Sequence, residues 1–292
     1  MTAPPDIPGA EHRFAEIETS DVGRLRVHYA EAGDGPPLLL LHGWPQHFWC
    51  WRRVVPELAG DFRLICPDLR GFGWTEAPGR GYDSETFAED AVALLDALGL
   101  ERVGVIGHDW GGFASILVAL KHPEQVGGLL AVSTPIPWLR PSLRLAAATW
   151  RTWYAWVLAA IGKEAVRRRP GAVHLMLRYG ARDEAIDEHE AETYAAPLRE
   201  PARAEASQLL YRAYLRSLVT LAERPYEGLR LTTPTRLVLG RGDQAIPEVT
   251  VRGVEPHADD VALEIVDGCG HFVPEERPDV VVRHARELFA PA

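Results

Sequence analysis

The sequence predicts an α/β fold in which a mostly parallel sheet is flanked by helices and interrupted by an all-helical insert. Three observations predict it. Strand and helix patterns alternate over the first half of the chain, residues 136–224 carry helical patterns only, and strand patterns return after them. Strands that alternate with helices form a parallel sheet covered on both faces.

The first half supplies most of the predicted sheet. Residues 25–30 alternate apolar and polar side chains, and residues 38–41 are four leucines typical of a buried strand. Further strands are predicted at 62–66, 103–106 and 129–132, and helices at 84–98 and 113–120.

The second half begins with a change of composition. Residues 136–224 are rich in Arg, Ala, Leu, Trp and Tyr and show no strand-like alternation, whereas strands at 235–239 and 261–266 and a helix at 280–289 follow. We therefore expect a core domain of residues 1–135 and 225–292 and a helical cap domain of residues 136–224. The cap should lie over the carboxyl edge of the sheet, where such folds place their sites.

Composition excludes several classes of protein. The 292 residues are enough for a full core with an interior pocket, and 31 basic against 41 acidic residues give a net charge of −10. That balance argues against a nucleic-acid or membrane partner, because both need clustered positive charge. Three cysteines without a CxxC motif, and no signal-peptide pattern at the N-terminus, lead us to expect a cytoplasmic protein. A homodimer is left open.

The most informative segment is 102–113, RVGVIGHDWGGF, which predicts a strand, a sharp turn and a helix. Asp109 stands at the turn between Gly107 and Gly111, where glycines leave room for an exposed central residue. Most turns of this form carry Ser as a nucleophile. An Asp here stays ionised, because the helix dipole and nearby N–H groups favour the anion. A helix-capping Asp would give the same local pattern.

Two further segments favour catalysis. His42-Gly43-Trp44-Pro45 follows the leucine run, so the Trp44 and Trp110 amides are placed to form an oxyanion hole. Asp243 and His271 each follow a predicted C-terminal strand. The chain order is then nucleophile, acid, base. Asp267 is the competing acid, which we interpret as a turn residue.

With these motifs the whole chain resembles the α/β-hydrolases of the epoxide hydrolase and haloalkane dehalogenase group, and among them the soluble epoxide hydrolases. The similar motifs are HGWP, PDLRGFGWT, GHDWGG, GRGD and GCGHF, and the resemblance covers about residues 20–290. It implies the α/β-hydrolase fold with an inserted helical cap.

An aspartate nucleophile suits displacement at saturated carbon. Attack by Asp109 gives an alkyl ester that water can hydrolyse, whereas Ser would leave an unreactive ether. His271, oriented by Asp243, would activate that water. No metal or organic cofactor is needed, and no metal-ligand spacing is visible.

The leaving group separates epoxides from halides. An opening epoxide develops an alkoxide and needs an acid. The resemblance assigns this role to two cap tyrosines. Tyr211, which is followed by Arg212, is similar to the second cap tyrosine of epoxide hydrolases, and Tyr154 is similar to the first. Any single Tyr can instead be a packing residue. Trp44, Trp110 and Trp138 are predicted to line the pocket for a small apolar epoxide. We thus predict an epoxide hydrolase; a haloalkane dehalogenase and a non-catalytic binding protein of the same fold remain alternatives.

Overall fold

Within the described residues, eight strands form one sheet. The computed structural model describes residues 3–140, 142–143, 145, 149–169, 171–182, 185–220 and 223–290. The strands are β1 (Glu11–Thr19), β2 (Gly23–Ala32), β3 (Pro37–Leu41), β4 (Arg63–Pro67), β5 (Val103–His108), β6 (Val126–Val132), β7 (Thr235–Gly240) and β8 (Val261–Val266).

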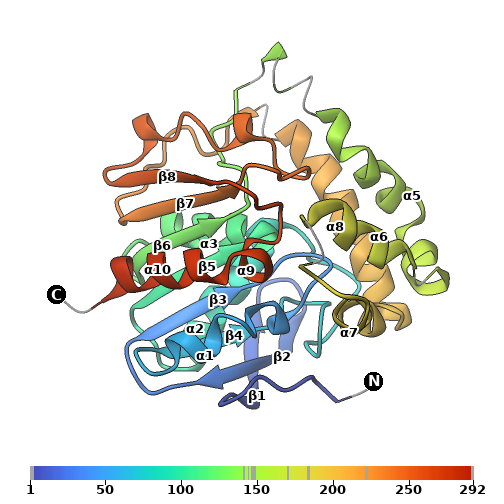
Figure 1. The fold of residues 1–292 in the computed structure, drawn as a ribbon, viewed down its shortest axis with the longest axis horizontal. Helices are drawn as coiled ribbons and strands as arrows, with labels where there is room; N and C mark the ends of the chain where they lie inside the picture. Colours follow the sequence, from blue (N-terminus) through green and yellow to red (C-terminus); the bar gives the residue numbers. More distant parts are fainter. Residues whose placement is uncertain are drawn as a thin grey trace.

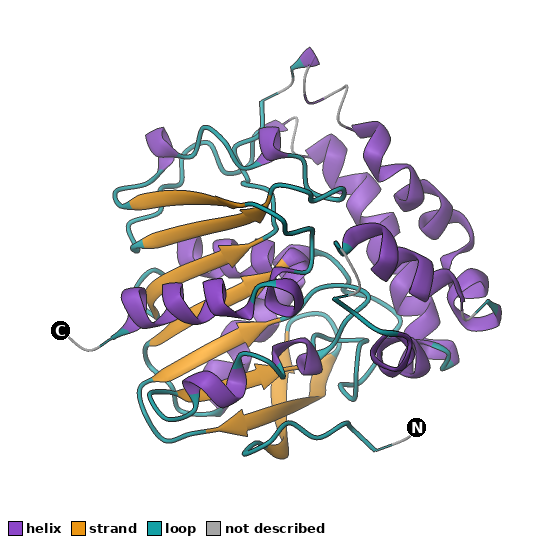
Figure 2. Ribbon diagram, in the orientation of Figure 1, coloured by secondary structure: helices purple, strands orange, loops and turns teal. Residues whose placement is uncertain are grey.

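The strand order is β1-β2-β4-β3-β5-β6-β7-β8. β2 pairs antiparallel with both β1 and β4, and the remaining neighbours are parallel. At the centre, Leu39 of β3 pairs with Ile65 of β4 and Val105 of β5, and all three are buried. Helices lie in front of and behind the sheet (Figure 2). This double cover explains the unbroken leucine run, because a strand buried on both faces needs no polar alternation.

The helices fall into two groups. α1 (Val55–Leu58), α2 (Ser84–Ala97), α3 (Asp109–Lys121), α9 (Val273–Glu276) and α10 (Pro278–Phe289) accompany the sheet. α5 (Trp153–Arg168), α6 (Gly171–Gly180), α7 (Glu188–Leu198) and α8 (Pro201–Thr220) lie between β6 and β7 in the chain, and we call them the cap helices. Short 3₁₀ turns are η1 (Phe48–Trp51), η2 (Thr149–Thr152), η4 (Glu248–Thr250) and η5 (Glu255–His257).

The cap helices gather at one end of the sheet (Figure 1). Asp109, which follows β5, shares a cavity with residues of α5 and α8, so this is the carboxyl edge of the parallel strands. The predicted insert 136–224 falls partly outside the described residues, at 141, 144, 146–148, 170, 183–184 and 221–222; its described part contains α5–α8 and no strand. Among the described helices, none combines the length and apolarity needed to cross a membrane.

The structure confirms the α/β fold and corrects two details. The strand β1 was not predicted, because only Ile17 of its nine residues is buried and its sequence lacks the apolar alternation of a half-buried strand. The helix predicted at 113–120 begins earlier, at Asp109. Its first turn contains Gly111 and Gly112, which pack closely against neighbouring segments. An apolar periodicity in the sequence does not extend over these glycines, so it placed the start of the helix too late.

Candidate active site

Asp109 occupies a strained turn between β5 and α3. Its φ is +53°, in the left-handed backbone region that residues other than glycine rarely adopt. The neighbouring glycines have a steric reason. A Cβ on Gly107 would lie 2.4 Å from the carbonyl oxygen of Gly111, and one on Gly111 would lie 2.4 Å from that of Leu41. The backbone therefore comes too close for any other residue at these two positions, and Asp109 is presented at the helix start.

Two backbone amides hold the Asp109 carboxylate. The Trp44 amide donates to Oδ2 of Asp109 over 3.0 Å, and the Trp110 amide also donates to this side chain. The loop that follows β3 can approach Asp109 so closely because residue 43 is glycine: a Cβ there would be 2.4 Å from Oδ2 of Asp109. The two expected oxyanion donors thus converge on one carboxylate.

His271 and Asp243 complete the cluster. Nδ1 of His271 lies 2.9 Å from Oδ2 of Asp243, and Nε2 of His271 lies 3.7 Å from Oδ1 of Asp109. The amides of Ala245 and Ile246 each donate to Oδ1 of Asp243 over 2.8 Å, which fixes that carboxylate. Residues from three distant segments of the chain therefore meet as the sequence order suggested.

Asp267 does not belong to this cluster. Its side chain pairs with Arg241 and is 79% exposed. The turn interpretation of Asp267 agrees with this position, and Asp243 is the carboxylate beside His271.

Burial and nearby charges act in opposite directions on the pKa of Asp109 and on that of His271. Burial raises the pKa of Asp109 to about 6, although His271 and the two amides act to lower it. For His271, burial acts to lower the pKa, but the charge and hydrogen bond of Asp243, with the charge of Asp109, raise it to about 9. Because neutral pH lies between these two pKa values, Asp109 is a carboxylate there and faces an imidazolium at 271.

Glu276 clamps the loop that carries His271. Its Oε2 accepts from the amide of Gly270 over 2.7 Å and its Oε1 accepts from that of Phe272 over 2.9 Å. The backbone amides of the two residues that flank His271 are thus tied to one carboxylate. Sequence reasoning missed Glu276, and its position five residues after the histidine is the signal that was available.

The cap helices contact the same loop. The His271 amide donates to the carbonyl oxygen of Gly180, the last residue of α6, over 2.8 Å. The Arg182 amide donates to Oε2 of Glu276 over 2.9 Å. On the other side, Nε2 of His108 lies 2.9 Å from the carbonyl oxygen of His271. The position of the imidazole therefore depends on both the sheet and the cap helices.

A cavity of about 420 Å³ opens above Asp109 and His271. Tyr154 of α5 and Tyr211 of α8 both line it, with ring centroids 6.0 Å apart. Burial raises the pKa of both phenols well above the usual range, and the Asp109 charge adds to the shift, so both hydroxyls keep their protons. Other lining residues include Trp44, Trp110, Phe113, Met176, Tyr179, Ala213, Tyr214 and Phe272.

The three tryptophans predicted to line the pocket have different positions. Trp44 and Trp110 line the cavity, and Tyr211 packs edge-on against both rings, at 5.0 and 6.2 Å. Trp138 does not line it. Its Nε1 donates to the carbonyl oxygen of Tyr226 over 2.7 Å, and its ring stacks on that of His257. The expectation for Trp138 was therefore wrong: the indole is engaged in packing away from the cavity.

Two cavity residues were seen in the sequence but given no role. Tyr214 lies one helical turn after Tyr211 on α8, and its ring is 6.0 Å from that of Trp110. Tyr179 of α6 lies 6.1 Å from Tyr154. The spacing of 211 and 214 was the available signal, since residues three apart share a helix face.

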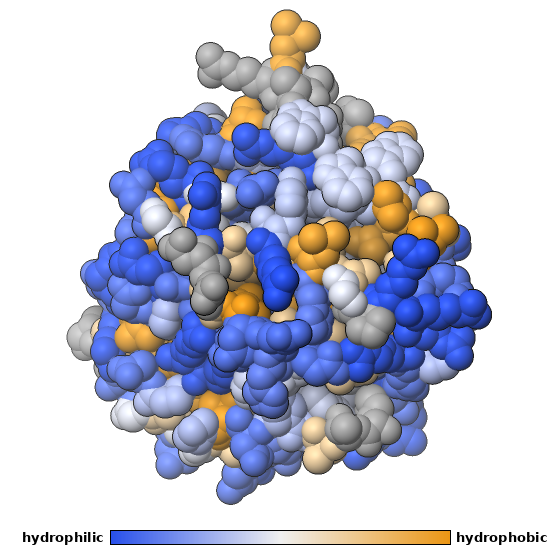
Figure 3. Space-filling model, turned by 45° about the vertical axis from the view of Figure 1, so that its right-hand side comes forward, coloured by the Kyte–Doolittle hydropathy of each residue, from blue (hydrophilic) through white to orange (hydrophobic). Residues whose placement is uncertain are grey.

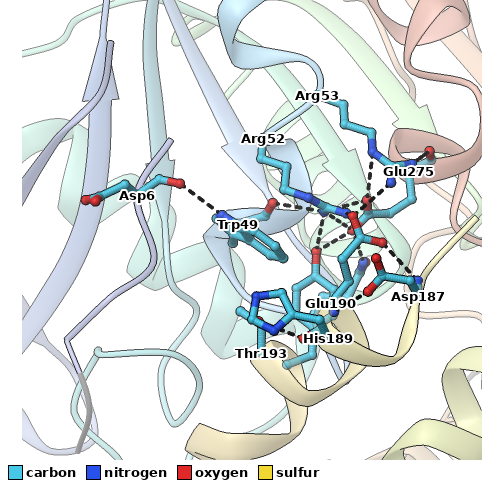
Figure 4. Close-up of polar contacts among 11 residues, drawn as sticks. Asp6, Trp49, Arg52, Arg53, Asp187, His189, Glu190, Thr193 and Glu275 are labelled. Carbon is cyan, nitrogen blue, oxygen red and sulfur yellow. Dashed lines mark hydrogen bonds and ion pairs between the residues drawn. The ribbon is translucent and has the colours of Figure 1, made fainter. Parts of the chain in front are cut away.

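A polar network ties α7 to the sheet side of the site (Figure 4). Glu275, whose side chain has no exposure, accepts from Arg52 over 2.6 Å, from Gln46 over 3.0 Å and from the hydroxyl of Tyr194. Arg52 also pairs with Glu190 of α7. Because Gln46 is two residues from Trp44 and Glu275 is four from His271, the network joins both active-site loops to the cap helices.

The described residues include no group of three His, Cys, Asp or Glu side chains arranged to hold a metal ion. The three cysteines are free and buried. At the floor of the cavity, His271 is already paired with Asp109 and Asp243. The cavity above them is open space for a small molecule.

Comparison with known proteins places this arrangement in a family. The family model described as "alpha/beta hydrolase fold" matches residues 36–278. The chain belongs to the α/β-hydrolase family.

Two of its relatives are named for different activities. It is 33% identical to a soluble epoxide hydrolase of Corynebacterium sp. (strain C12), over 92% of this chain and 96% of the relative. It is 30% identical to haloalkane dehalogenase 2 of Mycobacterium tuberculosis, over 92% and 93%. The solved structure of the epoxide hydrolase CorEH without ligand superposes with a TM-score of 0.78 at 31% identity and covers 96% of this chain and 99% of that one.

Proposed function

We propose that the protein opens epoxides to vicinal diols in two covalent steps. In the first step, Oδ1 of Asp109 attacks a ring carbon, a carbon–oxygen bond forms, and the epoxide carbon–oxygen bond breaks. The alkoxide takes its proton from Tyr211 or Tyr154. The product is an alkyl ester of Asp109.

In the second step the charge of Asp109 is gone, which removes one cause of the raised His271 pKa, and the imidazolium passes its proton to the tyrosinate. Neutral His271 then takes a proton from water, and the hydroxide adds to the carboxyl carbon of Asp109. The oxygen held by the Trp44 and Trp110 amides becomes the oxyanion, which these amides stabilise. Collapse expels the diol oxygen. The leaving alkoxide takes one proton of that water and His271 keeps the other, so Asp109, His271 and the tyrosine all return to their starting states.

The observation that carries the proposal is an aspartate, not a serine, at the strained turn, with Nε2 of His271 3.7 Å from it and two buried, protonated tyrosines in the same cavity. A carboxylate there suits displacement at saturated carbon, and the phenols supply the acid that an opening epoxide needs. We infer further that residues 136–224 form a cap domain on a core of residues 1–135 and 225–292. The lining favours a small apolar epoxide as substrate.

A haloalkane dehalogenase is the second candidate, because a relative carries that name at 30% identity. One contact argues against it. The indole N–H of Trp44 donates to Oγ of Ser207 over 3.0 Å, so this group is not free to bind a departing halide. Protonated phenols have no necessary part in halide departure, whereas an alkoxide needs them.

Substrate tests separate the candidates. We expect diol from an aryl epoxide such as styrene oxide, and no halide from 1-chlorobutane. Halide release without diol would favour the dehalogenase, and neither product would favour a binding protein.

A single turnover in oxygen-18 water tests the mechanism. The label should enter the Asp109 carboxylate and not the diol, because water attacks the ester carbonyl. His271→Gln should form the ester without hydrolysing it, so that intact-mass analysis finds a substrate adduct; His122→Gln, at a 40% exposed side chain, is the matched control. Label found directly in the diol would mean that water attacks the epoxide itself.

A further inference from the structure

The outer side of α5 exposes large apolar side chains. Trp153 is 49% exposed, Trp156 64% and Ile161 55%, and Trp150 in η2 is 68% exposed. We call Trp150, Trp153, Trp156, Val157 and Ile161 the tryptophan face. Residues 150, 153, 157 and 161 recur at helical spacing, so they form one stripe. Figure 3 shows hydrophobic side chains on this side of the molecule next to strongly hydrophilic ones.

α5 is therefore apolar on two sides. Its inner residues Ala155, Leu158 and Ala159 are buried against the protein, and Tyr154 lines the cavity. A helix that is apolar on two sides normally has a second apolar or interfacial neighbour. Exposed patches of this kind mark interaction sites.

The charge around the tryptophan face has the opposite sign to that of the whole chain. Residues 149–180 carry six basic residues and one acidic residue, Glu164, although the chain has a net charge of −10. Glu164 pairs with Arg168, and Glu205 of the neighbouring helix α8 pairs with Lys163. Arg151, Arg167 and Arg169 are exposed and form no ion pair with the residues that the structure describes. The net charge of −10 is a sum over the whole chain, so it conceals this local cluster of basic residues.

We propose that the tryptophan face binds an anionic lipid surface, with its indoles at the level of the headgroups and the neighbouring arginines on lipid phosphates. Trp is the residue best suited to such an interface, and an amphipathic helix with Arg on its polar side is the form that lies on it. Each Arg near the surface adds attraction to anionic lipids. A second copy of this chain fits less well, because a two-fold contact through this face would bring both arginine clusters together.

The cavity wall lies directly behind this face. Thr152, Tyr154 and Ala155 line the cavity, while Trp153 and Trp156 alternate with them on the outside. On the neighbouring helix α8, Ser217 and Thr220 also line it, and Leu218 and Val219 between them are exposed. Binding by this face would place the cavity beside the lipid, where apolar substrates concentrate.

Vesicle flotation tests the proposal on the full chain. We expect binding to phosphatidylcholine vesicles with added phosphatidylglycerol, weak binding to phosphatidylcholine alone, and a loss of binding as salt is raised. Arg167→Gln with Arg169→Gln should weaken binding about thirtyfold, since each Arg contributes about a factor of five. Trp150→Ser with Trp156→Ser should remove the quenching of tryptophan fluorescence by brominated lipid.

Matched controls keep the test decisive. Phe14→Ser, at a 43% exposed residue of β1, and Arg24→Gln with Arg80→Gln change the same residue types elsewhere and should leave vesicle binding intact. Circular dichroism checks that each variant is folded. No binding to anionic vesicles at low salt, equal binding by patch and control variants, or a dimer that dissociates in the tryptophan variants without any vesicle binding would each overturn the proposal.

Discussion

Asp109 shows how one residue can be both strained and charged. The left-handed backbone at 109 is tolerated because the amides of Trp44 and Trp110 hold its carboxylate and His271 faces it. Burial works against this charge and raises the pKa of Asp109 to about 6. The same groups that offset the burial are those the proposed second step uses, so the resting state already has the geometry of the oxyanion hole.

The first covalent step should depend on pH through Asp109. Because its pKa is raised to about 6, the attacking carboxylate is lost as the pH falls through that value. We expect the single-turnover rate of ester formation to fall about tenfold for each pH unit below it and to be level above it. Rapid quenching followed by mass analysis measures this rate. A rate that stays constant down to about pH 4 would contradict the assignment.

Glu276 should act as a positioning residue for the second step. Removing its carboxylate in Glu276→Ala frees the amides of Gly270 and Phe272, so the His271 loop loses its clamp. We expect ester hydrolysis to slow by about a hundredfold, because small displacements of a catalytic base are costly, while ester formation changes much less. The ester should then accumulate in the steady state. Glu287→Ala, at an exposed side chain, is the control; equal slowing of both steps would indicate general damage instead.

At the scale of the element, two cap helices supply the proposed acid. α5 and α8 run antiparallel, as shown by the pairing of Lys163 with Glu205 at one end and the approach of Tyr154 to Tyr211 further along. The Nε of Arg212 donates to the carbonyl oxygen of Ala159 over 2.9 Å, next to a break in the helix at Ile161. This contact fixes the rotation of α8 beside α5, and with it the direction of both tyrosines.

The tyrosine variants should distinguish the two substrate classes. We expect Tyr154→Phe and Tyr211→Phe each to slow epoxide opening and the double variant to slow it at least about a hundredfold, since general acid catalysis contributes that much. Any activity on a haloalkane should be insensitive. Tyr226→Phe, which also lines the cavity but donates to Glu85, is the control. Full epoxide activity in the double variant would remove the phenols from the mechanism.

The link between α7 and the sheet should be a stability determinant. Arg52→Met removes the buried cation that the Glu275 and Glu190 carboxylates share and leaves only the more exposed Arg53 beside them, so we expect a loss of about 3–5 kcal/mol in the free energy of unfolding. Urea denaturation measures it. The double variant with Glu275→Gln should lose less than the sum of the two single losses, because the residues share one network. Arg283→Met, at a 45% exposed side chain, should change stability by no more than about 0.5 kcal/mol.

At the scale of the whole molecule, the cavity exists only between the sheet and the cap helices. Asp109 and His271 come from the carboxyl edge of the parallel strands, and the tyrosines come from helices placed above that edge. Its volume of about 420 Å³ is in the range of pockets for small organic molecules. Under the proposed function, the cap helices would therefore set the size of the substrate, and the sheet side would set its chemistry.

Filling the cavity should change the choice of substrate and leave the chemistry intact. Ala213 lines the cavity and is buried, so Ala213→Leu reduces the space for a bulky group. We expect the ratio of kcat/KM for an aryl epoxide over a small alkyl epoxide to fall at least about tenfold, since pocket methylenes are each worth about 1–3 kcal/mol. Ala258→Leu, also buried but not among the cavity-lining residues, serves as the control. An unchanged ratio would mean that substrates bind elsewhere.

Much of the site followed from local patterns. The strand–turn–helix segment around Asp109, the glycine before Trp44 and the strand-end positions of Asp243 and His271 are all short-range features, because each depends on backbone geometry within a few residues. The prediction that Trp138 lines the pocket failed for a different reason. A tryptophan can line a pocket or pack in a core, and the direction of its indole depends on distant partners, here Tyr226 and His257.

The chain alone determined the α/β class, the interrupted sheet and the identity of the residues near position 109, since periodicity and turn chemistry are local. Tertiary packing decided that the Arg182 amide meets Glu276 beside the His271 loop, that Trp44 donates its indole to Ser207, and that Trp153 and Trp156 of α5 stay exposed. These facts involve residues separated by long stretches of chain or the orientation of whole helices. Such contacts form only when the cap helices settle on the sheet, so no short window of sequence contains them.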